Sequence, residues 1–175
     1  MSGSAVLTTA RIFALLIVAA ATLAHPNTAT ASTNFAQEVL DAHNYFRAHH
    51  GAAPLELDSE LNQQAQEWAD HLAGAGLFGH RPNNRYGENL YAAVGATTAS
   101  GQSVTEARYD EVRHYNFDTP GFSMSTGHFT QLVWKDTTKI GVGLATRANT
   151  TYVVANYDPP GNALGHFPAN VLRPQ

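Results

Sequence analysis

The chain has 175 residues, with 14 acidic and 10 basic side chains, nine histidines and no cysteine. This length fits one domain with a sizeable core, and the lack of cysteine excludes a disulfide framework, thiolate catalysis and any cysteine-ligated metal centre. The formal net charge of -4 argues against a nucleic-acid partner, because phosphate recognition needs concentrated positive charge.

The first 31 residues have the pattern of a secretory signal peptide. Arg11 precedes an uncharged apolar run, residues 12–21, and the small residues 29–31 (Ala-Thr-Ala) follow. Charge, apolar run and Ala-x-Ala in this order are typical of export, and the run is shorter than the roughly 20 residues of a membrane-spanning helix. We predict cleavage after Ala31, or alternatively after Ala24. The mature domain, residues 32–175, is then expected to be secreted and to hold no membrane span.

Two amphipathic helices are predicted at the start of the mature domain. Asn34 with Gln37 is typical of a helix start, and apolar residues follow at spacings of three and four until Gly51. A second helix is expected to begin at Asp58 and to end near Gly74. Their apolar stripes, which we expect in the core, are Phe35, Val39, Ala42 and Phe46 in the first helix and Leu61, Ala65, Trp68 and Leu72 in the second.

The middle of the chain is predicted to form two loops and a third helix. Residues 79–89 and 95–101 are rich in glycine and polar residues, which indicates loops. Ser103 with Glu106 has the spacing of a capping box and predicts a helix over about 103–115. Its face mixes apolar, aromatic and charged residues, so it either lines a cleft or forms a solvated edge.

The last third of the chain predicts a short helix and a β-hairpin. The short helix covers about 126–134, and two strand-like runs, 140–146 and 151–157, are joined by a connection of hairpin length. Helices followed by an antiparallel ribbon indicate an α+β domain.

Four residues in loops or on helices could carry chemistry: His80, Glu88, Glu111 and His128. No two of them have a local ligand spacing such as His-Glu-x-x-His, so the spacing alone leaves open whether they meet. Taken singly, each is more often an ordinary hydrogen-bonded or solvated residue. The other histidines of the predicted mature domain are not expected to bind metal; they are His43, His49, His50, His71, His114 and His166.

Five ordered sequence blocks resemble the CAP superfamily (cysteine-rich secretory proteins, antigen 5 and pathogenesis-related 1), in particular its pathogenesis-related-1-like secreted members. The resemblance extends from about residue 35 to 172, which is nearly the whole predicted mature domain. The blocks are 43–47 (HNYFR), 86–90 (YGENL), 109–117 (YDEVRHYNF), 127–135 (GHFTQLVWK) and 152–162 (YVVANYDPPGN).

The resemblance implies an α-β-α sandwich, in which a small antiparallel sheet lies between helical layers, with a central cleft lined by two histidines and two acidic residues. We expect this cleft to bind a divalent metal; a metal-free cleft, in which the carboxylates raise the pKa of the imidazoles, is the alternative. Matched by position, the cleft residues are His80, Glu88, Glu111 and His128. Zinc, magnesium or calcium is the implied ion. Two neutral imidazoles suit zinc, and the carboxylates would either ligate the ion or accept the second ring N–H of each histidine.

The chain departs from the family in having no cysteine. Val142 and Ala155 occupy strand positions where disulfide-bonded relatives often have cysteine, so we expect apolar packing to replace the covalent link. Asn149 begins a possible glycosylation sequon, residues 149–151, at the tip of the predicted hairpin. An ordinary polar turn is the alternative reading of this segment.

Three functions are compatible with these features. The first is a secreted binding protein that holds a small apolar ligand, a sterol or a fatty acid, with metal in the cleft. The second is an extracellular interaction or defence protein that contacts a protein partner through its loops. The third is a metal-dependent hydrolase or protease, in which His80 and His128 hold the metal and Glu88 or Glu111 acts as general base. A serine mechanism through Ser125 lacks the Gly-x-Ser-x-Gly surroundings.

Overall fold

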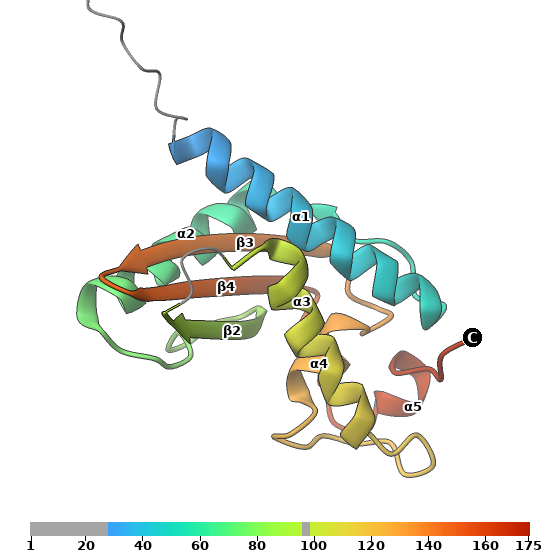
Figure 1. The fold of residues 1–175 in the computed structure, drawn as a ribbon. Helices are drawn as coiled ribbons and strands as arrows, with labels where there is room; N and C mark the ends of the chain where they lie inside the picture. The colour runs from blue at the N-terminus through green and yellow to red at the C-terminus, as the bar shows by residue number, and fades with distance from the viewer. Residues whose placement is uncertain (1–27, 96–98) are drawn as a thin grey trace, which may run out of the picture.

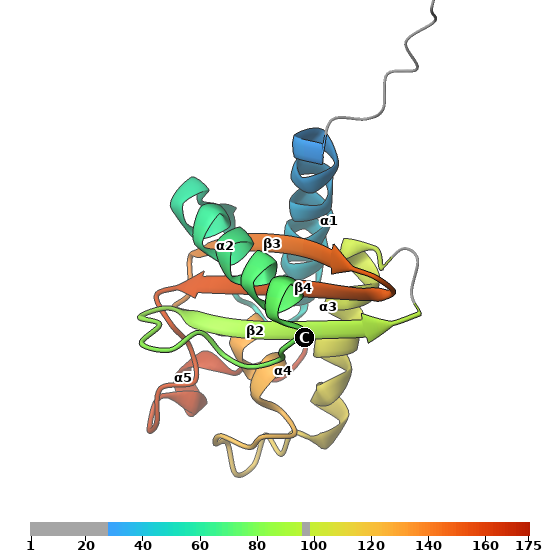
Figure 2. The ribbon, with the colours of Figure 1, turned by 90° about the vertical axis from the view of Figure 1, so that its left-hand side faces the viewer.

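The computed structural model describes residues 28–95 and 99–175 and shows three layers (Figures 1 and 2). Its elements are α1 (Thr28–His49), β1 (Glu56–Leu57), α2 (Ser59–Ala75), β2 (Gly87–Val94), α3 (Gly101–Tyr109), the 3-10 helix η1 (Asp110–His114), α4 (Gly127–Leu132), β3 (Lys139–Arg147), β4 (Thr150–Asp158) and α5 (Phe167–Asn170). The sheet, in the order β1-β3-β4-β2, packs against α2 on one face and against α1 and α3 on the other. The predicted α-β-α sandwich is confirmed.

The predicted signal peptide lies almost wholly outside the described residues. Arg11, the apolar run and the alternative cleavage position after Ala24 fall in residues 1–27, and side chains are described from Asn34 onward. Export therefore stays a prediction. Within the described part of the chain, no helix combines the length and the apolar character needed to cross a membrane.

The sheet contains the predicted hairpin and two strands that the sequence analysis does not predict. The strands β3 and β4 pair antiparallel, as expected. Antiparallel pairing with β4 holds β2 along its whole length, from Gly87 opposite Tyr157 to Val94 opposite Thr150. The loop predicted over 79–89 is therefore wrong for its last three residues. Short β1 adds to β3 in parallel, so the sheet is mixed rather than purely antiparallel.

Helix α2 forms as predicted and lies very close to the sheet. Its N-cap is Asp58, whose carboxylate accepts hydrogen bonds from two backbone amides of the first turn, and Gly76 ends the helix in the left-handed conformation. The close approach requires glycine in β3. A Cβ atom on Gly141 would lie 2.1 Å from the backbone carbon of Leu61, and one on Gly143 would lie 2.3 Å from that of Ala65.

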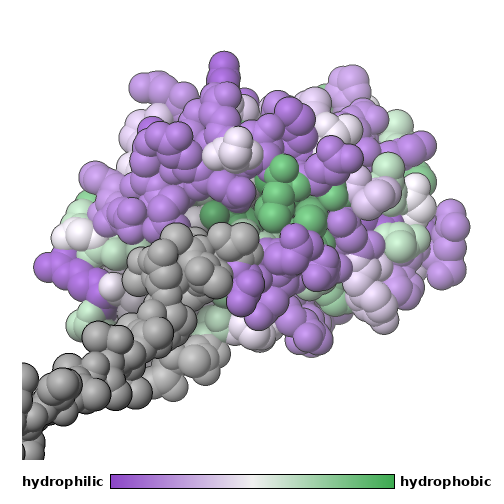
Figure 3. Space-filling model, turned by 90° about the horizontal axis from the view of Figure 1, so that it is seen from above, coloured by the Kyte–Doolittle hydropathy of each residue, from purple (hydrophilic) through white to green (hydrophobic). Residues whose placement is uncertain are grey.

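Side-chain amides of α2 also bond to the backbone of β3 along its free edge, past the two residues that pair with β1. Val142 N donates to the Asn62 side chain at 2.8 Å, and Gln66 both accepts from Leu144 N and donates to Leu144 O. These bonds satisfy backbone groups that would otherwise attract another strand. The space-filling view from above shows a small apolar area on this side of the molecule, framed by hydrophilic residues (Figure 3).

Helix α1 buries a face that includes polar residues. It begins at Thr28 rather than at Asn34, and Gln37 donates to Asp41 one turn later. Phe35 and Val39 are buried as predicted. The same face continues with buried His43 and Arg47, whereas Ala42 and Phe46 are only partly buried. The apolar spacing located the helix correctly but missed the polar residues of its core face.

The predicted third helix is two elements with a different cap. Ser100, not Ser103, is the N-cap of α3, and its hydroxyl accepts from Ser103 N. The α-helical geometry ends at Tyr109, and η1 continues to His114. This change of geometry places Glu111 at the start of the 3-10 turn, beside α4.

Apolar packing replaces the missing cysteines, as expected. Val142 and Ala155 are direct partners across β3 and β4, and both are buried in the cluster beneath α1 and α3. A separate cluster of aromatic and aliphatic side chains surrounds α4 and α5 and holds the first turn of α4 against η1.

Candidate functional site

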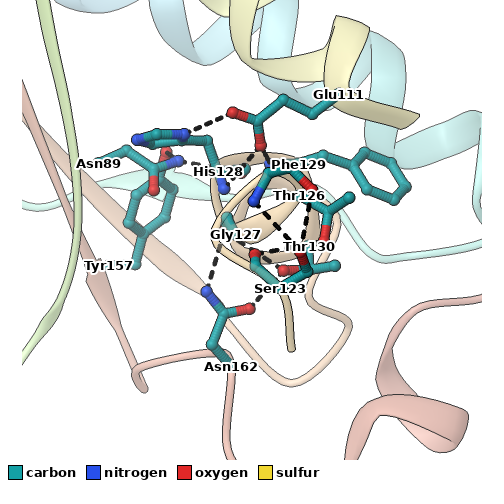
Figure 4. A network of polar contacts seen from close by, with 11 residues as sticks. Asn89, Glu111, Ser123, Thr126, Gly127, His128, Phe129, Thr130, Tyr157 and Asn162 are labelled. Atoms are coloured by element: carbon teal, nitrogen blue, oxygen red, sulfur yellow. Dashed lines mark hydrogen bonds and ion pairs between the residues drawn. The ribbon is translucent and has the colours of Figure 1, made fainter. Parts of the chain in front are cut away.

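His128 and Glu111 form a closely bonded pair where η1 meets α4 (Figure 4). The Nδ1 atom of His128 lies 2.6 Å from Glu111 Oε1. The other carboxylate oxygen accepts from the backbone amides of His128 and Phe129, at 3.0 and 3.1 Å. Glu111 therefore orients both the imidazole and the backbone that carries it.

His80 and Glu88 form a second pair at the start of β2. His80 Nδ1 lies 2.7 Å from Glu88 Oε1, which also accepts from Arg81 N. The second oxygen of Glu88 accepts from the Asn84 side chain at 3.2 Å. The Glu88 side chain is 4% exposed and the His80 side chain 66%, so a buried carboxylate holds an imidazole that faces solvent.

A cleft of about 130 Å³ joins the two pairs. It is lined by His80, Glu88, Asn89, Phe122, Met124, Gly127, His128 and Asn162. Glu111 is not part of this lining but contacts His128 from outside it. The structure thus brings all four predicted residues together, as two histidine–carboxylate pairs and not as a ring of four equivalent groups.

The geometry gives the carboxylates an orienting role. Each accepts from a ring Nδ1, which leaves the two Nε2 atoms as the nitrogens able to bind a ligand. In residues 28–95 and 99–175, no set of three or more histidine, aspartate or glutamate side chains is arranged to hold a metal ion. The groups that could hold an ion in the cleft are the two imidazole Nε2 atoms, with the carboxylates as their outer partners.

The pKa of Glu111 reflects this arrangement. Partial burial opposes ionisation of the carboxyl group, but hydrogen bonds from the His128 ring and from two backbone amides outweigh it and lower the pKa below its ordinary value. Glu111 is therefore ionised at neutral pH and acts as a hydrogen-bond acceptor toward the imidazole.

The loop after β4 positions α4 from the other side. Asn162, at a positive φ of 58°, donates to Gly127 O at 2.9 Å and accepts from the Thr130 hydroxyl at 2.6 Å. Ser125 lies in the loop before α4, where its hydroxyl forms a hydrogen bond with that of Ser123.

Several cleft residues were not singled out from the sequence. Asn89 stands in one of the family-like blocks, directly after Glu88, and Asn162 ends another. The spacing of residues in the sequence did not identify Phe122 or Met124.

The buried histidines His43 and His50 lie in the core. They bond to backbone carbonyls and tyrosine hydroxyls there.

The fold and the cleft together define an α-β-α sandwich domain with two carboxylate-oriented histidines. The model of the cysteine-rich secretory protein family, CAP, matches residues 40–157. The chain belongs to this CAP family, although it contains no cysteine.

Relatives and solved structures agree with this membership. The chain is 43% identical over 152 residues to Golgi-associated plant pathogenesis-related protein 1 of Homo sapiens, covering 83% of this chain and 97% of that protein. It is 42% identical to Secreted protein RBT4 of Candida albicans over 82% of this chain, but spans only 42% of that protein. The crystal structure of NaASP2 with Zn2+ has the same fold, with a TM-score of 0.61 and 22% identity over 79% of this chain and 85% of that one.

Proposed function

We propose that this chain is an exported binding protein that holds a divalent metal in the two-histidine cleft and a small apolar ligand in a separate groove between α1 and α3. The observation that carries the metal proposal is the convergence of two imidazoles on one cleft, each oriented through Nδ1 by its own carboxylate. Nitrogen ligands favour zinc over magnesium or calcium, which prefer oxygen. Export is supported by the N-terminal sequence pattern and by the name of the secreted relative.

Metal binding should stabilise the protein in a histidine-dependent way. After chelator treatment, Zn²⁺ at about 100 times its Kd should raise the free energy of unfolding by about 2.7 kcal/mol, because the ion binds the folded state. His80→Ala/His128→Ala should abolish this increase. Thermal unfolding with Zn²⁺ or Mg²⁺ measures the effect.

The matched control is His49→Ala/His114→Ala, since both histidines are exposed and lie outside the cleft. This variant should respond to Zn²⁺ as the wild type does. An equal response of the cleft variant would contradict binding between His80 and His128.

The apolar ligand needs more space than the cleft provides. Ligand pockets are usually about 300–1,000 Å³, whereas the cleft is about 130 Å³. A groove of about 670 Å³ between α1 and α3 is large enough. Its described lining consists of Glu38, Asp41, Ala42, Tyr45, Phe46, Ser100, Gln102 and Glu106.

The charges of this groove favour a sterol over a fatty acid. Three carboxylates and no basic residue are among the described lining side chains, and Tyr45 and Phe46 supply aromatic surface. A fatty-acid carboxylate would be repelled by like charge, whereas an uncharged sterol would not.

Cholesterol should therefore bind more tightly than palmitate. The double substitution Asp41→Asn/Glu106→Gln should raise the affinity for palmitate about fivefold, because it relieves roughly 1 kcal/mol of charge repulsion. Binding of the two labelled ligands gives the comparison. The control is Glu67→Gln/Asp70→Asn on α2. It changes the charge equally, and each of its carboxylates, like those of Asp41 and Glu106, accepts from a glutamine one turn earlier. Glu67 also pairs with Arg81 at 3.5 Å. Palmitate binding that exceeds sterol binding, or that responds equally to both variants, would refute the assignment.

The geometry gives the hydrolase alternative no support. Each of the four oxygens of Glu88 and Glu111 already accepts a hydrogen bond from the protein. Both carboxylates are thus engaged as hydrogen-bond acceptors within the protein, which favours an orienting role over that of a general base. An extracellular interaction or defence role fits the same domain, because Phe122 and Met124 expose apolar surface at the rim of the cleft, at 49% and 84%.

A further inference from the structure

Asn89 connects the cleft to the buried side of the sheet. It lies in β2, is 5% exposed, and lines the cleft together with His80 and His128. Its Nδ2 atom donates two hydrogen bonds, to His128 O and to the Tyr157 hydroxyl, both at 3.1 Å. Figure 4 shows Asn89 beside the His128 imidazole, with the Tyr157 ring below it in the view.

The chemistry of the partners determines how the Asn89 carboxamide is oriented. His128 O can only accept a hydrogen bond, so the carboxamide atom facing it must be the nitrogen. The opposite orientation of the carboxamide would place two oxygens in contact.

The far end of the network requires the same orientation. His43 Nδ1 must donate to Val39 O at 2.8 Å, so Nε2 of the neutral ring is an acceptor. The Tyr157 hydroxyl, 2.9 Å from Nε2, therefore donates to His43, and its oxygen accepts from Asn89. The bonds from Asn89 through Tyr157 and His43 to Val39 therefore all run in one direction, and Asn89 donates in the opposite direction to His128 O.

The carboxamide oxygen of Asn89, Oδ1, then remains available to accept a hydrogen bond. Both Nδ2 hydrogens are used, and Oδ1 has no protein partner among the described residues. Oδ1 is nevertheless not fully enclosed in the described chain, so part of its surface is in contact with open space. Asn89 lines two such spaces, the cleft and a smaller internal cavity beside Tyr91 and Arg108, and the proposal assigns Oδ1 to the cleft.

We propose that Asn89 is a positioning and ligand-binding residue of the cleft. Its Nδ2 holds the backbone of His128 in place, and its Oδ1 accepts a hydrogen bond from a water or hydroxyl held between the two imidazoles. The ligand part of this inference rests on the proposed function, whereas the positioning of His128 does not.

Asn89→Leu removes both roles with little change in size. In the metal-free protein, the imidazole NMR signals of His128 should shift or broaden, while those of His80, which belongs to the other pair, should stay in place. The Zn²⁺ affinity measured by calorimetry should fall about tenfold or more, as for the loss of other groups that orient metal ligands.

Asn170→Leu is the matched control, because Asn170 is equally buried but bonds to Asp136, away from the cleft. It should lower stability without moving the His128 signals or the Zn²⁺ affinity. Tyr157→Phe removes one partner of Nδ2 and retains Asn89, so it should move the His128 signals in the same direction but less.

The wild-type protein provides a test that does not depend on folding of a variant. The two side-chain Nδ2 protons of Asn89 should give distinct NMR signals protected from exchange. Unprotected protons, or unchanged His128 signals in Asn89→Leu, would overturn the proposal. Failure of the wild type to bind Zn²⁺ would instead refute the proposed metal and the ligand role of Oδ1, while the metal-free His128 signals still decide the positioning role.

Discussion

Replacement of Arg47 by methionine should lower the free energy of unfolding by about 3–5 kcal/mol, a loss typical of breaking a buried charged network. Arg47 is fully buried in α1, and its guanidinium donates to four backbone carbonyls. These carbonyls belong to Ala53, Leu132, Trp134 and Thr137. One side chain therefore joins α1 to the segment that connects α4 with β3.

The cost arises because methionine fills similar space but donates no hydrogen bond. Burial lowers the pKa of Arg47 to about 10, and removing the charge recovers part of its desolvation cost. The carbonyls left without their donor outweigh this gain. Arg47→Lys should also destabilise, since one ammonium group cannot reproduce the fork of a guanidinium.

Denaturant unfolding measures the change, and Arg113→Met is the control. Arg113 is 62% exposed and bonds within its own helical turn, so its replacement should alter stability by no more than about 0.5 kcal/mol. An effect of Arg47→Met as small as that of the control would show that the carbonyls find other donors.

Stability should fall between pH 6.5 and about 4 because His43 must remain neutral in the folded protein. Burial lowers the pKa of His43 from 6.5 to about 4, against the raising effect of its bond to Val39. Above pH 6.5 the ring is neutral in both the folded and the unfolded state, so its titration does not lower the free energy of unfolding there. As the pH falls below 6.5, the unfolded chain binds the proton first, and up to roughly 3 kcal/mol of stability is lost by pH 4.

Unfolding measured against pH in wild type and His43→Gln isolates this effect, because the variant lacks the titrating ring. The wild-type free energy should decline more steeply with falling pH between 6.5 and 4.5. His50, whose pKa is also lowered by burial, contributes to the decline in both proteins. An NMR titration of the folded wild type provides a second test: protonation of His43 near pH 6.5 would contradict the explanation.

Elements with strong local signals were predicted well. Asp58, the apolar stripe and the terminal glycines define α2 within the segment itself, and alternating patterns with a short connection define the β3–β4 hairpin. The strand β2 was missed because Gly87, Glu88 and Asn89 have little strand preference of their own. Pairing with β4 decides their conformation.

The buried polar face of α1 was missed for a related reason. Periodicity identifies apolar residues, but His43 and Arg47 are buried because hydroxyl and carbonyl partners far along the chain satisfy them. Those partners are visible only once the chain is folded.

The amino-acid sequence by itself determined the helices and the hairpin, the family-like blocks and the four candidate residues His80, Glu88, Glu111 and His128. Only the tertiary structure decided that they form two oriented pairs around one cleft, with Asn89 beside His128. The physical reason is that a hydrogen bond needs its two atoms within about 3 Å of each other. Only the strand register and the packing of η1 against α4 bring these residues that close. Such long-range contacts leave no periodic trace along the chain.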